Sequence, residues 1–149
     1  MVGALDLGTT GVRFFLFDRR ARPLTFAYRE LPLSFPRPGW VEQDPIAMVE
    51  HSLAVIREAL EKAELSPADL LGFGLTNQRE TVVLWERETG KPLGPAIVWQ
   101  DRRTAARCQA LRSSPLAPEI RAKTGLLPDP YFSATKLEWF LSQDEELRR

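Results

Sequence analysis

Apolar residues at the start of the chain form short runs that are separated by polar or glycine-containing turns. A run over 2–7 is ended by Gly8, and a second run over 12–17 has apolar residues in both of its alternating sets. Polar residues follow at 18–23, and strand character resumes over 24–31. This succession predicts an antiparallel meander whose second strand is central and covered on two faces.

The next regular element predicted is a helix over 45–62, with Asp44 as N-cap and Pro45 as the first helical residue. Apolar residues recur within it at spacings of three and four, which predicts a buried stripe. The stripe consists of Ile46, Val49, Leu53, Ile56 and Leu60. His51 falls on the polar side of the helix, so we expect it to be solvated rather than to act as a base.

Short strands and helices alternate in the second half of the chain. The pattern predicts strands over 70–75, 81–85 and 96–99, a turn at 88–91, and helices over 104–111, 116–123 and from 133 to the end. Trp40, Trp85 and Trp139 are interpreted as core or partly buried residues, and Cys108 as a helix residue that faces its neighbours. The last helical pattern has no C-cap glycine or proline stop, so we expect a truncated part of a longer protein.

Composition narrows the classes of function. The chain has 20 Lys+Arg and 20 Asp+Glu, so it lacks the basic excess typical of nucleic-acid binders. One cysteine and one histidine exclude a disulfide framework and disfavour a Cys/His metal site, but a magnesium site built from oxygen ligands stays possible. There is no signal peptide and no run of roughly 20 apolar residues. We therefore expect a cytoplasmic protein without nucleic-acid or membrane partners.

The turn between the first two predicted strands, DLGTTGVR at 6–13, carries candidate phosphate chemistry. Gly8 and Gly11 permit a positive-φ turn and a close approach of the backbone to a ligand. Thr9 and Thr10 bring hydroxyl and N–H groups to the same place, and such groups suit phosphate oxygens.

Two charged residues flank this turn. Arg13 would add positive charge, and Asp6 would hold Mg²⁺ directly or through water. The turn is neither a P-loop nor a dinucleotide fingerprint, because it leads into a strand and lacks the required spacing. Taken alone, the octapeptide also fits an ordinary glycine-rich hairpin.

A second group of residues suits a polyol. Arg79 and Glu80 lie in a polar run at 76–81, where a guanidinium could donate to hydroxyls and a carboxylate could accept from them. Trp99 and Tyr131 offer flat surfaces for a carbon backbone. The alternatives are an exposed ion pair for Arg79 and Glu80, and core packing for the two aromatic residues.

Six segments, in order, resemble the FGGY family of carbohydrate kinases, and within it the glycerol kinases. They are LDLGTTGVR at 5–13, PGWVEQDP at 38–45, GLTNQRET at 74–81, WERETGKPL at 85–93, AIVWQDRRT at 96–104 and TGLLPDPYFSATKLEW at 124–139. The resemblance implies an α/β fold of the ribonuclease-H-like, actin-like ATPase class, in which a mixed sheet with an antiparallel meander has flanking helices. Residues 1–149 would be the N-terminal part of the first domain, without the second, nucleotide-binding domain.

The same resemblance implies an ATP:glycerol phosphotransferase that uses ATP and Mg²⁺ and acts on glycerol or a similar small polyol. The glycerol pocket would be lined by Arg79, Glu80, Trp99 and Tyr131. The nucleotide phosphates would be faced by Thr9, Thr10, Gly11 and Arg13, with Asp6 near the metal.

The family's catalytic base would lie beyond residue 149, so no catalytic residue is assigned in this chain. The isolated chain is therefore expected to be inactive, and the full-length protein is expected to be a homo-oligomer.

The sequence departs from the glycerol kinase pattern at a few positions. Leu7 stands where these kinases usually carry glutamine, and Gly11-Val12 where they usually carry two serines. Asp101 also differs from the usual residue, with no consequence expected. Two alternatives therefore stay open: a family member that acts on another polyol or a ketose, and a non-enzymatic actin-like module that binds nucleotide.

Overall fold

The computed structural model describes residues 1–143, which form two compact units. The first unit comprises residues 1–33 and 43–78, and the second comprises residues 34–42 and 79–143 of the described chain. The helix predicted from 133 to the end is present to residue 143, and its continuation lies outside the described residues. Within the described part, no helix is long and apolar enough to cross a membrane.

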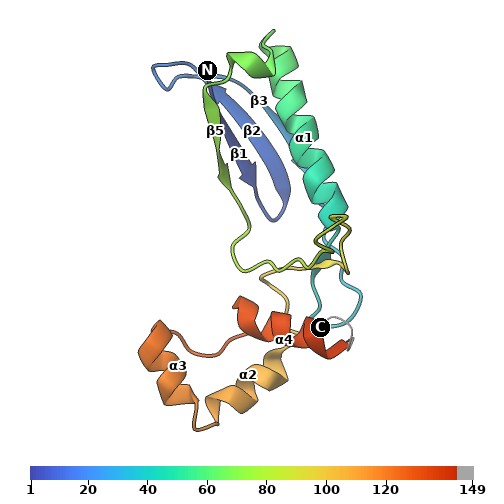
Figure 1. Ribbon diagram of the computed structural model, residues 1–149, viewed down its shortest axis with the longest axis vertical. Helices are drawn as coiled ribbons and strands as arrows, with labels where there is room; N and C mark the ends of the chain where they lie inside the picture. Colours follow the sequence, from blue (N-terminus) through green and yellow to red (C-terminus); the bar gives the residue numbers. More distant parts are fainter. Residues whose placement is uncertain (144–149) are drawn as a thin grey trace. The chain divides into compact units, whose positions relative to one another are not determined.

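The first unit contains a four-stranded sheet with the order β3-β2-β1-β5 (Figure 1). Its strands are β1 (Val2–Leu7), β2 (Gly11–Phe17), β3 (Pro23–Glu30) and β5 (Gly72–Thr76). The first three pair antiparallel as a meander, whereas β5 runs parallel to β1. The predicted mixed sheet, with β2 between two other strands, is confirmed.

Helix α1 (Pro45–Lys62) lies along the sheet in the first unit (Figure 1). The side chain of Asp44 accepts a hydrogen bond from the Ile46 N–H at 2.8 Å, which confirms the predicted N-cap. A short 3-10 turn (Pro67–Asp69) then precedes β5.

The buried face of α1 differs from the predicted one. The helix buries Met48, Val55, Ala59 and Leu60, whereas three members of the predicted stripe are exposed: Ile46, Val49 and Leu53. Apolar residues occupy two adjacent faces of α1, and only one of these faces contacts the sheet. Spacing alone therefore could not tell which stripe is buried.

The two faces of β2 are covered unequally. Val12, Phe14 and Leu16 are fully buried, while Phe15 and Phe17 are half-buried. On this second face the aromatic rings stack on one another, with Phe15 and Phe26 separated by 5.4 Å between ring centroids. The expectation that β2 is covered on two faces is therefore met fully on one face and in part on the other.

The second unit has little sheet and three helices within the described residues. Strand β4 (Glu42–Gln43), whose first residue belongs to this unit, pairs with β6 (Ala96–Ile97). The helices are α2 (Ala105–Arg112), α3 (Ala117–Thr124) and α4 (Ser133–Gln143). A small apolar core joins Val82, Ile97 and Phe140.

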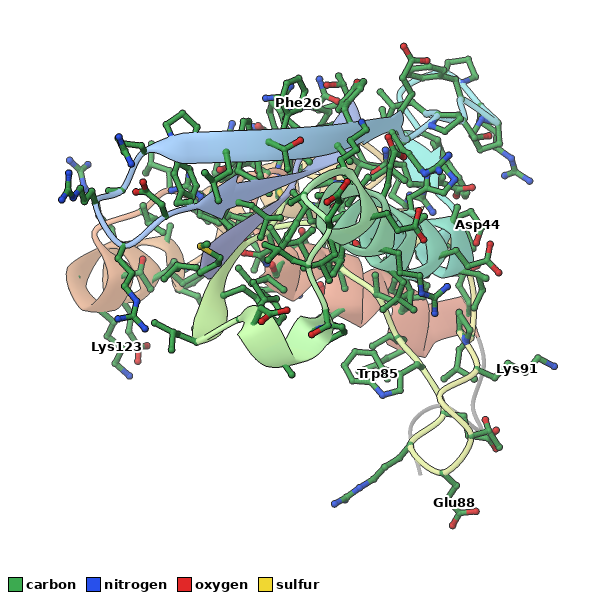
Figure 2. The ribbon with its side chains drawn as sticks, turned by 90° about the horizontal axis from the view of Figure 1, so that it is seen from above. Phe26, Asp44, Trp85, Glu88, Lys91 and Lys123 are labelled. Atoms are coloured by element: carbon green, nitrogen blue, oxygen red, sulfur yellow. The ribbon has the colours of Figure 1, made fainter. Side chains whose placement is uncertain are left out.

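The strand predicted over 81–85 does not form. Only two isolated bridges occur there, from Val82 to Ile97 and from Trp85 to Pro92. Trp85 is 61% exposed on the loop whose tip carries Glu88 (Figure 2), so its interpretation as at least partly buried was wrong. The predicted turn is confirmed, with Gly90 at a φ of 72°.

Candidate functional site

The turn that joins β1 to β2, which we call the glycine hairpin (residues 8–11), is closed by a hydrogen bond from the Gly8 N–H to the Gly11 carbonyl at 3.0 Å. Neither glycine has a positive φ. The expectation that these two residues supply a left-handed turn is therefore wrong.

Gly11 instead allows Tyr28 to pack closely against the hairpin. A Cβ at this position would lie 2.3 Å from the ring of Tyr28, far inside normal contact distance. The Tyr28 hydroxyl also donates to the Thr10 carbonyl at 3.3 Å. Tyr28 thus covers the end of the hairpin, and a side chain at position 11 would displace it.

Two buried glutamines hold the first half of the hairpin. The amide nitrogen of Gln43 donates to the Thr9 carbonyl at 2.7 Å, and that of Gln78 donates to the Gly8 carbonyl at 2.9 Å. The two side chains also bond to each other, from Gln78 Nε2 to Gln43 Oε1 at 2.9 Å. Residues that are distant in sequence therefore determine the conformation of this turn.

All four carbonyl oxygens of the glycine hairpin accept hydrogen bonds from the protein. Besides the Gly8 and Thr9 carbonyls, the Thr10 carbonyl accepts from the Leu31 N–H at 3.1 Å and the Gly11 carbonyl accepts from Gly8. A carbonyl oxygen repels a phosphate, whereas hydroxyl and N–H groups attract it. Engaging the carbonyls within the protein therefore makes the hairpin more suitable for an anion.

Asp6 and Arg13 are opposite each other in the antiparallel register of β1 and β2. The two charged groups lie 3.9 Å apart, and both side chains are about half-exposed. The guanidinium of Arg13 also lies 5.4 Å from the centroid of the Tyr28 ring. Strand pairing therefore places a positive and a negative group together at the base of the hairpin.

The described residues contain no group of three His, Cys, Asp or Glu side chains arranged to hold a metal ion. Mg²⁺ in phosphate-transfer sites is commonly held by one or two carboxylates, together with phosphates and water. Asp6 fits such a site as a single carboxylate ligand.

In the second unit, Glu80 is fixed by the start of α4. Its Oε2 atom accepts from the Ser133 N–H at 2.8 Å and from the Ser133 hydroxyl at 2.6 Å. Glu80 also has a φ of 65°, an uncommon conformation for a residue other than glycine. A negative charge at a helix N-terminus is favourable, so Glu80 both stabilises α4 and is held by it.

Trp99 and Tyr131 form an edge-to-face pair, with ring centroids 5.8 Å apart. The backbone N–H of Trp99 donates to the hydroxyl of Thr81, which follows Glu80 in the chain. Tyr131 is 37% exposed, so its ring is not buried in the core. The structure therefore brings these two aromatic residues together, close to the segment that carries Glu80.

Lys136 connects Glu80 to Tyr131. This side chain is fully buried, and its Nζ atom donates to the Glu80 carbonyl at 2.9 Å and to the Tyr131 carbonyl at 2.6 Å. Burial lowers the pKa of the Lys136 ammonium, and the neighbouring carboxylate of Glu80 acts in the opposite direction. We call Glu80, Trp99 and Tyr131, with Ser133 and Lys136, the Glu80 cluster.

The loop before Tyr131 is held by Asp129. One oxygen of this carboxylate accepts from the Tyr131 N–H at 2.9 Å and from Arg102 at 3.2 Å, and the other accepts from Arg112 at 2.9 Å. Burial alone would raise the pKa of Asp129, but these hydrogen bonds and positive charges outweigh it, and the pKa is lowered.

Arg79 is the one predicted pocket residue that the structure does not bring into the Glu80 cluster. Its side chain is exposed and makes no hydrogen bond or ion pair with residues 1–143. The alternative of an exposed Arg79–Glu80 ion pair is also wrong, because the Glu80 carboxylate bonds to Ser133 instead.

Asp101 has a structural consequence that the sequence did not reveal. It is buried, accepts from the Val41 N–H at 2.7 Å, and pairs with the buried guanidinium of Arg103 at 2.8 Å. That guanidinium is 3.8 Å from the ring centroid of Trp40 and 4.6 Å from that of Trp139. A buried ion pair that packs against two indole rings therefore joins three separate segments of the second unit.

Sequence reasoning missed four supporting side chains: Gln43, Gln78, Ser133 and Lys136. Gln78 and Ser133 lie in segments that also contain predicted site residues, so the sequence did not distinguish a supporting function from a direct one, and Gln43 lies in a segment for which no site residue was predicted. Lys136 carried a usable signal, because it lies one helical turn before the buried Phe140 and so on the same face of α4.

The family profile described as the FGGY family of carbohydrate kinases, N-terminal domain, matches residues 1–149. A glycerol kinase of Ralstonia pickettii is 54% identical over 138 residues, which cover 93% of this chain and 28% of the relative. A glycerol kinase of Rhodospirillum rubrum is 53% identical over 146 residues, which cover 98% of this chain and 30% of the relative. The chain therefore spans somewhat less than one third of the length of these relatives.

Solved structures show the same relationship. A crystal structure of Plasmodium falciparum glycerol kinase with ADP matches with a TM-score of 0.89 and 30% identity, over 99% of this chain and 30% of that one. A xylulose kinase from Rhodospirillum rubrum matches with a TM-score of 0.86 and 28% identity, over 97% of this chain and 30% of that one. The ribonuclease-H-like, actin-like architecture is confirmed by these neighbours.

Proposed function

The chain belongs to the FGGY family of carbohydrate kinases, and we propose that it is part of an enzyme that transfers the γ-phosphoryl group of ATP to glycerol. The product would be glycerol 3-phosphate. Sequence identity supports glycerol as the acceptor, since the two relatives at 53–54% identity are glycerol kinases. The solved structures do not separate the two acceptors, because the glycerol kinase is 30% identical to this chain and the xylulose kinase 28%.

The fixed carboxylate of Glu80 beside Trp99 and Tyr131 is the observation that carries this proposal. Both hydrogen bonds from Ser133 go to Oε2, which leaves Oε1 to accept from substrate hydroxyls. The paired rings of Trp99 and Tyr131 provide an apolar surface for the carbon backbone of a polyol. Arg79, which is exposed in the same unit, would donate to a hydroxyl oxygen.

The glycine hairpin supplies the other half of the proposed chemistry. Thr9, Thr10 and Gly11 would meet the phosphates of ATP through hydroxyl and N–H groups, and Arg13 would balance their negative charge. Asp6 would be a ligand of Mg²⁺, directly or through water. The magnesium ion, when bound, neutralises charge on the phosphates during transfer.

The reaction balances as follows. A hydroxyl oxygen of glycerol forms a bond to the γ-phosphorus, the bond from that phosphorus to the bridging oxygen breaks, and ADP leaves. The proton of the hydroxyl goes to a base, which we expect outside residues 1–149. The residues of this chain bind and orient the reactants, and binding in a productive orientation is itself a large part of catalysis.

The test uses a complete kinase chain in which residues 1–149 replace the matching segment of the Rhodospirillum rubrum glycerol kinase. ADP formation is measured with ATP and Mg²⁺ and with glycerol, xylulose or gluconate as acceptor. We expect glycerol to be used with the highest kcat/KM. A higher kcat/KM for xylulose or gluconate would contradict the proposed substrate.

The same chain tests the role of Glu80. Losing a hydrogen bond to a charged group costs about 1.5–3 kcal/mol, so Glu80→Ala should lower kcat/KM for glycerol about ten- to a hundredfold. Glu88→Ala, a change at the exposed loop tip shown in Figure 2, is the matched control and should have no effect. An unchanged kcat/KM in Glu80→Ala would contradict a role for Glu80 in substrate binding.

A further inference from the structure

Lys136 is the one fully buried lysine among the described residues, and neither of the two carbonyls that it contacts belongs to its own helix. Its Nζ atom joins the Glu80 carbonyl, which lies 56 positions away in sequence, to the Tyr131 carbonyl. A buried ammonium is costly unless it is well paired, and a methionine of similar shape would fill the same space without that cost. The charge at this position therefore calls for an explanation beyond packing.

The two residues whose carbonyls Lys136 contacts, Glu80 and Tyr131, explain why a charge is present at this position. Both residues are proposed substrate contacts, and they come from loops that no regular secondary structure holds together. Glu80 has a left-handed backbone conformation, which persists only where surrounding contacts hold it. One ammonium group that bonds to both backbones sets the distance between the Glu80 and Tyr131 segments.

Ser133 completes the arrangement one helical turn earlier on α4. Lys136 bonds to the backbone of residue 80, whereas Ser133 bonds to its carboxylate at 2.6 and 2.8 Å. The backbone and the side chain of Glu80 are thus held separately by the same helix. Rotation of the carboxylate is restricted, so Oε1 keeps one direction.

We propose that Lys136 and Ser133 are positioning residues that set the spacing and orientation of Glu80 and Tyr131 around the polyol. This inference rests on the proposed function of the Glu80 cluster. It assigns to the first turn of α4 a role in substrate affinity without direct contact with the substrate. A preformed pocket binds more tightly than a mobile one, because less conformational entropy is lost on binding.

The experiment compares Lys136→Met and Ser133→Ala in the complete kinase chain described above. Lys136→Met removes both bonds, so the KM for glycerol should rise about tenfold while the KM for ATP changes less than about twofold. Ser133→Ala keeps the backbone N–H donor and should raise the KM for glycerol about threefold. Because Ser133→Ala removes only a hydroxyl, it tests the proposal even if Lys136→Met fails to fold.

Thr135→Val is the matched control for loss of stability. Thr135 is a buried neighbour on the same helix, and its hydroxyl bonds to Thr104 at 2.9 Å rather than to the Glu80 cluster. We expect this variant to lower the melting temperature while leaving both KM values unchanged. The control therefore separates the effect of a weakened helix from that of a displaced Glu80.

The proposal is overturned if Lys136→Met or Ser133→Ala lowers only the melting temperature, as Thr135→Val does, or raises both KM values equally. If the unsubstituted chain prefers another polyol or a ketose, the proposed substrate is wrong. In that case the KM for the preferred substrate decides the role of Lys136. A chain that is inactive with every acceptor overturns both the proposed function and this inference.

Discussion

The glycine hairpin and the Glu80 cluster hold their side chains by different means. In the hairpin, neighbouring strands place Asp6 opposite Arg13, and the intervening turn is only four residues long. In the Glu80 cluster, no strand or helix contains more than one of the proposed substrate contacts, and the bonds to Glu80 span 53 and 56 positions in sequence. Strand pairing places the charged residues of the first region, and Gln43 and Gln78 hold its turn, whereas the second region has no strand pairing and depends on side-chain hydrogen bonds alone.

This difference determines what should damage each region. A sheet is weakened mainly by steric change within its strands, while a cluster held by buried charges is weakened by loss of a single partner. Because the two regions belong to separate units, amide hydrogen exchange can report on each of them independently. The four predictions below use this contrast.

The largest effect is expected from Arg103→Leu in the second unit. The substitution leaves the buried carboxylate of Asp101 without its ion-pair partner, and such losses typically cost about 3–5 kcal/mol of unfolding free energy. Denaturant titration and amide exchange should show faster opening around Trp99, with the exchange of the glycine hairpin unchanged.

Arg102→Leu is the matched control for that prediction. The neighbouring arginine is exposed and pairs with Asp129 at 3.2 Å, so its removal should cost less than about 1 kcal/mol. Equal losses of unfolding free energy in the two variants would show that the burial of Arg103 does not increase its contribution to stability.

A smaller effect is expected from Gly3→Ala in β1. A Cβ there would lie 2.3 Å from the buried ring of Phe14, so overpacking should lower the unfolding free energy by about 1–3 kcal/mol. Gly74→Ala in β5 is the control, because nothing lies within 4 Å of a Cβ at that position. Thermal denaturation of both variants checks this, and a stability loss in Gly74→Ala as large as in Gly3→Ala would contradict it.

Gln43→Leu tests whether distant residues hold the hairpin turn. It leaves the Thr9 carbonyl without its donor at 2.7 Å, which should cost about 1–2 kcal/mol. Since Gln78 bonds to Gln43, Gln43→Leu and Gln78→Leu should be non-additive in a double-mutant cycle. Strict additivity of the two losses would show that the glutamines act separately.

The smallest effect concerns the pH dependence of the loop before Tyr131. The pKa of Asp129 is lowered in the folded state, so its stabilising contribution is complete only well above the pKa of an unfolded aspartate. The contribution is lost as the pH falls through the lowered pKa. Unfolding free energies measured from pH 2 to 6 should therefore fall less steeply on acidification in Asp129→Asn than in the unsubstituted chain, and parallel curves would contradict the assignment.

Much of the first unit could be predicted from local patterns. Alternating apolar runs located β1, β2 and β3, and an aspartate followed by proline located the start of α1. These signals work because strand pairing and helix capping depend on residues that are close in sequence. The buried face of α1 was predicted wrongly, because two faces of that helix are apolar and only contact with the sheet selects one.

In the second unit, local patterns were less informative. The apolar residues at 81–85 have strand character, but no continuous partner strand forms beside them, and only isolated bridges result. Trp85 is exposed for the same reason, since the segment that carries it has no sheet to cover.

The sequence by itself determined the residue types of both candidate sites: the threonines and charges at 6–13, and Glu80, Trp99 and Tyr131. It also determined the family resemblance, which the match of the FGGY profile to residues 1–149 confirms. Only the tertiary structure decided which residues hold them in place. Four side chains do so through hydrogen bonds to segments far away in sequence: Gln43, Gln78, Ser133 and Lys136. A polar group taken out of water is stable only where its hydrogen-bond partners are brought together in space, and only the fold brings them together.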